Sequence, residues 1–263
     1  MTTRTDAESP TPKKIVVVGA SGRMGALFME WGQEVGLNMV ALNRPYKNVE
    51  ETVSDADLVI VSVPAKVFED VLSVLIPHLP PKAILTDVVS VKETPLRQME
   101  RLWGGDIVGT HPLFGPKNEP GDDLPVAIVP GKNCSSKAIA IVESFYRRLG
   151  CRVFRTTAKK HDEAVARIQN LNFVTNLAYF AALAENRDLL PFLTPSFERR
   201  KKSAAKMLTE DAEMFAGLFD ANPHSHEAAR QYRKMLNIAA SGDIDLLCKR
   251  ARWWWSPESD QDK

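Results

Sequence analysis

The stretch that most constrains this sequence runs from Lys14 to Gly25 and reads KIVVVGASGRMG. Its four apolar, mostly β-branched residues, Ile15 to Val18, are too few for a buried helix and predict a buried parallel strand. The run ends at Gly19, and apolar residues at helical spacing follow at once. A strand, a glycine turn and a helix in this order gather backbone N–H groups and the positive end of a helix dipole at one point. Such a point favours phosphate binding.

The glycine spacing is a variant of the dinucleotide-binding fingerprint. The three glycines form G-x-x-G-x-x-G, and Ser21 stands where a middle glycine is usual. The alternative is an ordinary strand–turn–helix whose glycines only relieve close packing. We expect a dinucleotide cofactor to contact this turn and the end of a later strand, at Gly19, Ala20, Ser21, Gly22, Arg23, Met24, Gly25, Val63 and Pro64.

Composition limits the partners. The 263 residues include 34 basic and 33 acidic ones, so the net charge of +1 attracts neither nucleic acid nor an anionic membrane. The basic run Arg199–Lys202 is interpreted as a solvated helix face. No apolar run approaches the roughly 18 residues of a membrane span, and the N-terminus lacks the apolar region of a signal peptide. Three scattered cysteines form no disulfide framework and no metal-ligand spacing, which favours a cytoplasmic protein without a metal.

Strands and helices alternate along the first part of the chain. The polar residues 1–12 and 256–263 are predicted to be disordered. The alternation over residues 13–157 predicts an α/β domain with a doubly wound parallel sheet, whose ligands bind at the carboxyl ends of the strands. Strands are expected at Ile15–Val18, Asn38–Leu42, Leu58–Val63, Ala83–Asp87, Asp106–Gly109, Pro125–Val129 and Arg152–Arg155.

The pattern changes near Thr157. Residues 158–255 show only helical periodicity and predict an all-α domain. An all-helical half with so much apolar surface often buries it against a second copy of itself, so we expect a homodimer formed through this domain. Helices are expected at Ala164–Ala184, Lys201–Leu218, Ser225–Ser241 and Asp243–Trp255, with a break over Leu189–Phe197.

Three stretches carry candidate chemistry, and the first is Gly109–Pro116, GTHPLFGP. It follows the strand predicted to end at Gly109, so His111 is expected in a loop at the carboxyl end of that strand. Pro112 and Pro116 stiffen this loop. An imidazole of near-neutral pKa suits a general base. The alternative is a histidine that only caps the strand.

The second stretch is Asp87–Lys92, DVVSVK, at the same edge of the predicted sheet. The Ser90 hydroxyl could orient His111 or the substrate, and the Lys92 ammonium could bind a substrate carboxylate. Alternatively, Ser90 and Glu93 form a capping box at the start of a helix.

The third stretch is His161–Asn172, HDEAVARIQNLN. His161 and Asp162 are interpreted as the beginning of a helix, with the aspartate near its positive end. Gln169 and Asn172 lie three residues apart and could line a polar cleft. Taken singly, each of these residues is more readily explained by structure than by function.

Together these stretches resemble one family. GASGRMG, VIVSVP, D-x-x-SVK, GTHPLFGP and HD-x5-IQ-x-L occur in the order typical of prephenate dehydrogenases. The resemblance spans about Lys14 to Trp255, and its specific part is HPLFGP with SVK upstream. It implies a Rossmann domain, a helical dimerisation domain and oxidative decarboxylation of a cyclohexadienol with NAD or NADP. His111 matches the catalytic histidine, Ser90 a residue of the catalytic centre, and Lys92 a residue near a substrate carboxylate.

The departures from the family concern the substrate. Phe173 stands where the family has a second histidine, and Lys206 where it has an arginine that binds the substrate carboxylate. Another arginine of close relatives falls on Glu198, with Arg199 adjacent. Lysine lacks the planar fork that matches a carboxylate. The substrate is therefore expected to be 4-amino-4-deoxyprephenate or prephenate, with arogenate or a non-catalytic dinucleotide-binding role as alternatives.

Residues at the end of the second predicted strand indicate which nicotinamide cofactor is bound. An acidic residue there, about 20 residues beyond the glycine loop, would bind the 2′-hydroxyl of NAD. This chain has Asn43 followed by Arg44. Asparagine does not repel a 2′-phosphate, and a guanidinium can bind one through charge-assisted hydrogen bonds. Alternatively, Arg44 stacks on the adenine of either cofactor. We expect NADP or NAD, with NADP favoured.

Overall fold

The computed structural model describes residues 11–117 and 121–256. The chain divides into two compact units, Met1–Asp162 and Glu163–Lys263. The sequence pattern changes near Thr157, a few residues before this division.

Some expectations concern the ends of the chain and its relation to membranes. The segments predicted to be disordered, 1–12 and 256–263, lie outside the described residues except for residues 11, 12 and 256. Within the described part of the chain, no helix has both the length and the apolar content needed to cross a bilayer.

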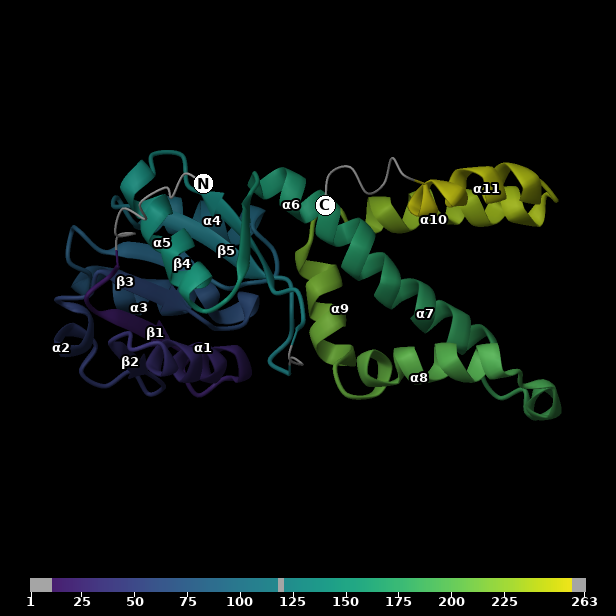
Figure 1. The fold of residues 1–263 in the computed structure, drawn as a ribbon, viewed down its shortest axis with the longest axis horizontal. Coiled ribbons are helices and arrows are strands. Elements are labelled where there is room, and N and C mark those ends of the chain that lie inside the picture. Colours follow the sequence, from purple (N-terminus) through teal and green to yellow (C-terminus); the bar gives the residue numbers. More distant parts are fainter. Residues whose placement is uncertain (1–10, 118–120, 257–263) are drawn as a thin grey trace, which may run out of the picture. The chain divides into compact units, whose positions relative to one another are not determined.

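Within the described residues, the first unit is built on one seven-stranded sheet (Figure 1). Its strands are β1 (Ile15–Val18), β2 (Met39–Leu42), β3 (Leu58–Val61), β4 (Ile84–Asp87), β5 (Ile107–Pro112), β6 (Pro125–Pro130) and β7 (Arg152–Arg155). They are arranged in the order β2-β1-β3-β4-β5-β6-β7, and the strands from β1 to β5 pair in parallel. β1 and β3 are fully buried runs of Val, Ile and Leu, as expected where helices cover both faces. The predicted fold class is confirmed.

The sheet is nevertheless not parallel throughout. β6 pairs antiparallel with β5, and β7 pairs parallel with β6. A parallel neighbour requires a crossover of a dozen or more residues, usually a helix packed on the sheet. The described residues between Pro112 and Pro125 contain no helix, so the chain returns beside β5 in the opposite direction.

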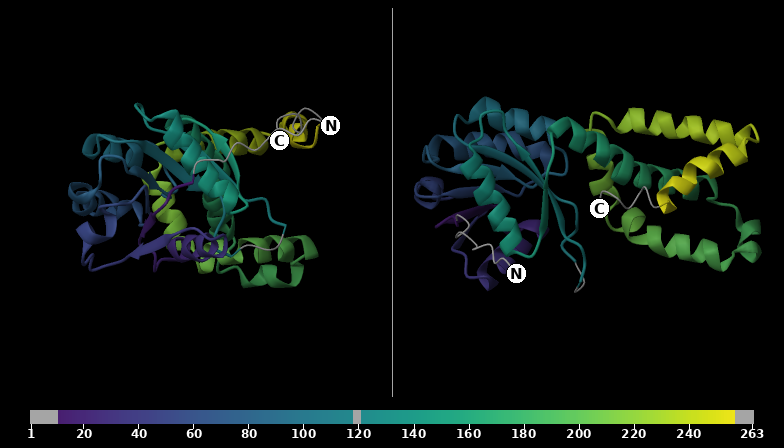
Figure 2. Two further views of the ribbon diagram at one scale, coloured as in Figure 1. Left: turned by 60° about the vertical axis from the view of Figure 1, so that its left-hand side comes forward. Right: turned by 45° about the horizontal axis from the view of Figure 1, so that its top comes forward.

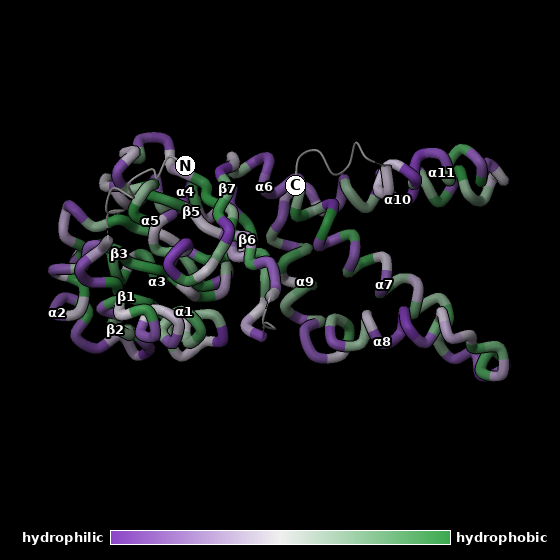
Figure 3. The backbone as a smooth tube through the Cα atoms, viewed as in Figure 1, coloured by the Kyte–Doolittle hydropathy of each residue, from purple (hydrophilic) through white to green (hydrophobic). Residues whose placement is uncertain are grey.

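Helices cover both faces of this sheet. They are α1 (Arg23–Glu34), α2 (Val49–Val53), α3 (Phe68–Leu75), α4 (Glu93–Leu102) and α5 (Ser136–Arg148), with short 3₁₀ turns at Ala65–Val67 and Ile76–His78. Phe28 of α1 packs against Phe145 and Tyr146 of α5 and against the strands. α3 contacts both α2 and α4 on the opposite face, as right-handed crossovers require. Burying one such aromatic ring contributes about 1.5–3 kcal/mol to the stability of the fold. Figure 3 shows that the apolar residues of the first unit are concentrated in its strands.

α6 (Ala158–Val165) crosses the division, and among the described residues the second unit contains helices only (Figure 2). They are the π-helical turn η3 (Ala166–Asn170), α7 (Leu171–Ala182), the 3₁₀ helix η4 (Arg187–Phe192), α8 (Pro195–Thr209), α9 (Ala212–Ala221), α10 (Ser225–Ala240), α11 (Ile244–Ala251) and the 3₁₀ turn η5 (Arg252–Trp255).

Two helix predictions in this unit need correction. The helix expected over Lys201–Leu218 is two helices, α8 and α9, which are separated at Glu210–Asp211. α8 also begins earlier, inside the predicted break, because the Thr194 hydroxyl accepts the Phe197 N–H and Pro195 occupies the first helical position. Threonine followed by proline is a typical helix start.

Candidate active site

The glycine turn has the geometry that its sequence predicts. Gly19 follows β1 with a φ of +81°, and a side chain there would overlap the carbonyl oxygen of Ser62. A side chain at Gly25 would overlap the carbonyl oxygen of Gly19, so this glycine allows α1 to pack closely on the turn. Gly22 is the N-cap of α1 and offers no capping side chain. The first turn of α1 holds no acidic residue either, which leaves its N-terminus suited to an anion.

The other residues predicted to contact the cofactor lie around this turn. Ser21 and Arg23 are exposed, Ala20 is buried and Met24 is half-buried. Val63 and Pro64 follow β3, the strand next to β1 in the sheet, and at least part of each is exposed. These residues therefore lie at the carboxyl ends of two neighbouring parallel strands, where open α/β sheets bind ligands.

Asn43 is tied to the glycine turn. Its Oδ1 accepts a hydrogen bond of 2.8 Å from the backbone N–H of Ser21. A backbone N–H only donates, so the oxygen of the Asn43 amide must face the turn and its NH₂ group must point away from it. The next residue, Arg44, is exposed.

His111 lies inside a strand, so its predicted place in a loop is wrong. β4 ends beside Gly109, but antiparallel pairing with β6 continues to Pro112 and places His111 opposite Ala127. This pairing keeps the chain extended beyond the last parallel contact. His111 thereby lies two residues past the end of β4, at the same edge of the sheet as the glycine turn.

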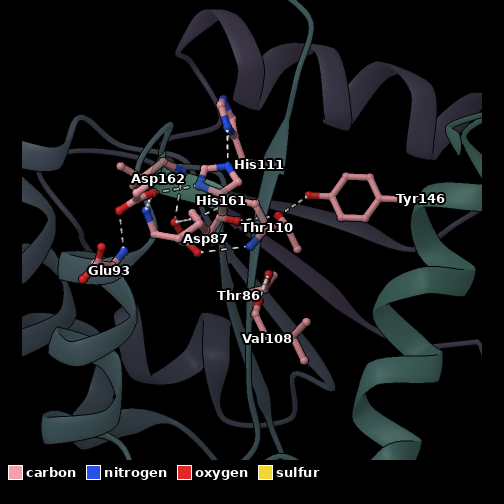
Figure 4. Close-up of polar contacts among 11 residues, drawn as sticks. Thr86, Asp87, Glu93, Val108, Thr110, His111, Tyr146, His161 and Asp162 are labelled. Carbon is pink, nitrogen blue, oxygen red and sulfur yellow. Dashed lines mark hydrogen bonds and ion pairs between the residues drawn. The ribbon is translucent and has the colours of Figure 1, made fainter. Parts of the chain in front are cut away.

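A chain of hydrogen bonds leads from His111 to the start of α4 (Figure 4). Nδ1 of His111 lies 2.9 Å from Nε2 of His161, and Nδ1 of His161 lies 2.7 Å from the Asp162 carboxylate. That carboxylate accepts the backbone N–H groups of Lys92 at 2.7 Å and Glu93 at 2.9 Å. His111 and His161 are only 5% and 4% exposed. The imidazole of His111 is thus held in one orientation.

The environment of His111 favours its neutral form. Burial lowers the pKa of this imidazole well below its ordinary value of 6.5, and His161 and Lys92 lower it further. Nε2 of His111 has no hydrogen-bond partner among the described residues, so it is the ring nitrogen whose lone pair is not already engaged. A neutral imidazole held in this way can accept a proton.

Lys92 is fully buried, so the prediction that it binds a substrate carboxylate is not supported. Its ammonium forms an ion pair with Asp87 and donates to the carbonyl oxygen of Thr110 at 2.6 Å. Burial raises the pKa of Asp87 and lowers that of Lys92, and the attraction between them opposes both shifts. The pair joins the end of β4 to the middle of β5, next to His111.

The same network supports the loop that carries Ser90. The Asp87 carboxylate accepts the backbone N–H of Val89 at 3.0 Å, and Tyr146 lies 2.7 Å from the Thr110 hydroxyl. Ser90 is half-buried and makes no side-chain hydrogen bond to a described residue. The capping box proposed for Ser90 and Glu93 is therefore wrong, because Asp162 accepts the N–H groups at the start of α4. The catalytic role of Ser90 stays a prediction.

A family model described as the nucleotide-binding domain of prephenate dehydrogenase matches residues 32–155. The T-protein of Enterobacter agglomerans is 29% identical over 231 residues, which are 85% of this chain and 60% of that protein. The chain is thus similar to prephenate dehydrogenases, over the matched domain and over most of its own length. It spans less than two thirds of the length of that T-protein.

Two further members of the comparison bear on substrate and fold. The 4-amino-4-deoxyprephenate dehydrogenase of Streptomyces pristinaespiralis is 28% identical over 195 residues, 65% of this chain and 64% of that protein. The crystal structure of prephenate dehydrogenase from A. aeolicus, in complex with hydroxyphenyl propionate and NAD+, superposes with a TM-score of 0.78 at 19% identity. It covers 97% of this chain and 100% of that one, which shows a shared fold.

Two residues predicted to bind substrate lie where the chain turns from η3 into α7. Gln169 is half-buried in η3, and Asn172 is exposed on α7, where its amide nitrogen lies 3.9 Å from the sulfur of Met207. Phe173 is buried and stacks on Phe215, with ring centroids 5.6 Å apart. A ring packed in this way belongs to the core of the helical unit, so direct substrate contact by Phe173 is not supported.

The predicted substrate-binding cations of the helical unit are exposed on α8. Lys206 lies 3.8 Å from Asp211, and Arg199 donates to the Ser196 hydroxyl at 3.1 Å. Glu198 pairs with Lys201 on the same helix. Lys206 and Arg199 therefore carry charges that solvent or a ligand can reach, and their substrate-binding roles stay predictions.

Sequence reasoning assigned no site role to three residues of this network. From the sequence, Asp87 was predicted only to end a strand, and His161 and Asp162 were predicted only to begin a helix. The adjacent histidine and aspartate inside the family motif HD-x5-IQ-x-L were the available signal. Their partners, however, lie 50 and about 70 residues away in the chain, so no spacing rule could have identified them.

Proposed function

We propose that this chain belongs to the prephenate dehydrogenase family and is a nicotinamide-dependent dehydrogenase that oxidatively decarboxylates a cyclohexadiene carboxylate. The observation that carries the proposal is the orientation of His111. Its Nδ1 is held through His161 and Asp162, and its Nε2 remains available at the sheet edge that also carries the glycine turn. A positioned base beside a dinucleotide site is what such a reaction requires.

The residues present fit a nicotinamide dinucleotide. A side chain at Gly19 or Gly25 would fill the turn, and the uncapped N-terminus of α1 suits a pyrophosphate. The cofactor, when bound, supplies an acceptor for the hydride that leaves the substrate ring. The protein has to place the reacting carbon and the base.

His111 moves one proton in the proposed mechanism. Nε2 accepts the proton of the hydroxyl or amino group on the ring carbon that loses its hydride. The C–CO₂ bond of the ring carboxylate then breaks, CO₂ leaves, and its electron pair completes the aromatic ring. The proton returns from Nε2 to the oxygen or nitrogen of the new aromatic product. Aromatisation provides the driving force.

The substrate is proposed to be prephenate or 4-amino-4-deoxyprephenate. Phe173 packs on Phe215 where the family has a histidine, and Lys206 replaces a carboxylate-binding arginine. These changes support a substrate that resembles prephenate without being identical to it. The named relative from Streptomyces pristinaespiralis supports the amino analogue.

The test measures reduced-cofactor formation with prephenate, 4-amino-4-deoxyprephenate and arogenate, each with NAD+ and NADP+. We expect turnover of prephenate or the amino analogue, with loss of CO₂. Turnover of arogenate alone would change the substrate assignment. A protein that binds the cofactor but oxidises none of the three would be a non-catalytic dinucleotide-binding protein and would contradict the proposal.

The cofactor is proposed to be NADP in preference to NAD. The side-chain oxygen of Asn43 accepts a hydrogen bond from the backbone N–H of Ser21. The NH₂ group of Asn43, which is a hydrogen-bond donor, is therefore left to face a ligand. A donor attracts a 2′-phosphate, and the exposed Arg44 can add charge-assisted hydrogen bonds.

We predict that Asn43→Asp shifts the ratio of kcat/KM for NADP+ over NAD+ at least tenfold toward NAD+. The aspartate can keep the hydrogen bond to Ser21 while its second oxygen repels the phosphate. Arg44→Ala should weaken NADP+ only. A wild-type protein that prefers NAD+ tenfold would overturn the proposal. Equal weakening of both cofactors by Arg44→Ala would make Arg44 a stacking residue.

The helical unit is proposed to form a homodimer. Among the described residues, all but three of the exposed large apolar side chains belong to this unit, including Phe192 at 78% and Trp255 at 82% exposure. We predict a mass in light scattering of twice the 29.3 kDa of one chain. Leu190→Glu with Phe192→Glu should yield monomers, and Phe154→Glu in the first unit should not. A wild-type monomer at micromolar concentration would refute the dimer.

A cytoplasmic location is proposed from the cysteines. Cys134, Cys151 and Cys248 are all unpaired. Burial raises the pKa of the Cys151 thiol to about 12, which keeps it protonated and unreactive. Unpaired cysteines are typical of a reducing compartment.

A further inference from the structure

We infer that Asp162 and His161 are positioning residues that hold His111 in the tautomer whose Nε2 accepts a proton. The inference rests on the proposed function, because only a reaction that needs a base makes use of this tautomer. Neither residue is needed to touch the substrate. Each acts through the next member of the hydrogen-bond chain.

The direction of every hydrogen bond follows from its first member. The backbone N–H groups of Lys92 and Glu93 can only donate, so both oxygens of Asp162 act as acceptors, as an ionised carboxylate requires. Nδ1 of His161 faces that carboxylate at 2.7 Å and must carry a proton. A neutral His161 then has its lone pair on Nε2.

The same reasoning extends to His111. Nε2 of His161 accepts, so Nδ1 of His111, 2.9 Å away, must donate. A neutral His111 then has its lone pair on Nε2, the nitrogen without a partner among the described residues. The tautomer of the base is thus determined by backbone groups at the start of a helix, two side chains away.

The hydrogen bonds of the chain persist when the base is protonated. When Nε2 of His111 accepts a proton, the imidazolium still donates through Nδ1 to His161, and His161 still donates to Asp162. No group has to turn over during the proton transfer.

α6 is suited to this task because His161 and Asp162 are consecutive. Both are buried, and the His161 backbone N–H is bonded within the start of α6 to the Thr157 carbonyl oxygen at 2.9 Å. One rigid helical turn therefore presents the imidazole to β5 and the carboxylate to α4. Displacing this turn would release both contacts together.

The decisive variant is Asp162→Leu. Leucine has no acceptor for Nδ1 of His161, which in the wild type faces the same carboxylate oxygen as the Lys92 N–H. The proton of His161 is then no longer held on Nδ1, and His111 is no longer restricted to the tautomer with its lone pair on Nε2. We expect kcat to fall by roughly 10- to 10³-fold, with the KM values for substrate and cofactor within a fewfold.

A matched control and a rescue pair separate positioning from folding. Asp106 accepts the backbone N–H and the hydroxyl of Ser135 at the start of α5, so Asp106→Leu makes the same change at another helix start and should leave kcat unchanged. His161→Gln keeps an acceptor for Nδ1 of His111 and should retain more activity than His161→Leu.

The tautomer itself is read from the ¹⁵N chemical shifts of His111 in the full-length protein. We expect a protonated Nδ1 and an unprotonated Nε2 in the wild type, and a mixture of the two tautomers in Asp162→Leu. A wild-type His111 with its proton on Nε2, or an unchanged tautomer in Asp162→Leu, would overturn the inference. The shifts need no turnover, so a failure of the proposed function would appear only in the substrate assays.

Discussion

Replacing His111 with asparagine lowers kcat by about 10²–10⁴-fold and leaves cofactor affinity unchanged. The asparagine amide can still donate to Nε2 of His161 from near the position of Nδ1, so the local packing is retained. It has no atom at the position of Nε2, and the proton of the substrate then has no acceptor. Steady-state kinetics measure the fall in kcat. The affinity for the cofactor is measured by adding cofactor to the protein and following the change in protein fluorescence.

The matched control for this variant is the exposed His78, which lies far from β5 in the sequence. His78→Asn removes an imidazole of the same chemistry and should leave kcat within error of the wild type. If His111→Asn keeps turnover within a fewfold of the wild type, His111 is not the base.

The pH dependence of kcat/KM gives an independent check of the same residue. The base must be neutral to accept a proton, so activity falls as the pH drops through its pKa. Burial, His161 and Lys92 all lower the pKa of His111. The decline in activity on the acid side should therefore lie well below pH 6.5 and should be absent from the residual activity of His111→Asn.

Replacing Lys92 with methionine destabilises the protein by about 3–5 kcal/mol, because it leaves the carboxylate of Asp87 buried without its partner. Both side chains are fully buried, so water cannot compensate for the loss. The double variant Asp87→Asn with Lys92→Met removes both charges, and we expect it to regain more than half of the lost stability. Urea-induced unfolding, followed by circular dichroism, measures both changes.

An exposed ion pair provides the comparison for this experiment. Lys201→Met breaks the contact with Glu198 on the surface of α8, and we expect a cost of less than about 1 kcal/mol. A Lys92→Met variant as stable as Lys201→Met would show that the buried pair contributes little. The same result would remove the support we assign to the loop that carries Ser90.

The local features of this protein were predictable from its sequence. The strand, glycine turn and helix at Lys14–Gly25 depend on neighbouring residues only, namely β-branched runs, a glycine able to adopt positive φ and helical spacing. The all-helical second unit was predictable for the same reason. The family motifs selected His111 and Ser90 without any knowledge of the fold.

Errors arose where structure depends on a distant partner. The extent of β5 depends on β6, which pairs with it through Pro112 and keeps His111 in a strand. Lys92 had the chemistry of a ligand for carboxylates, but its carboxylate partner is Asp87, inside the protein. Neither fact can be derived from the spacing of residues along the chain.

The sequence by itself determined the α/β and all-α division, the dinucleotide turn and the identity of the candidate base, because short-range propensity and spacing control these features. Only the tertiary structure decided the tautomer of that base and the role of Lys92. Sheet order and the packing of α6 bring together groups that lie 50 to about 70 residues apart in the chain. Because these groups are buried, their hydrogen-bond donors and acceptors can pair with one another in only one way.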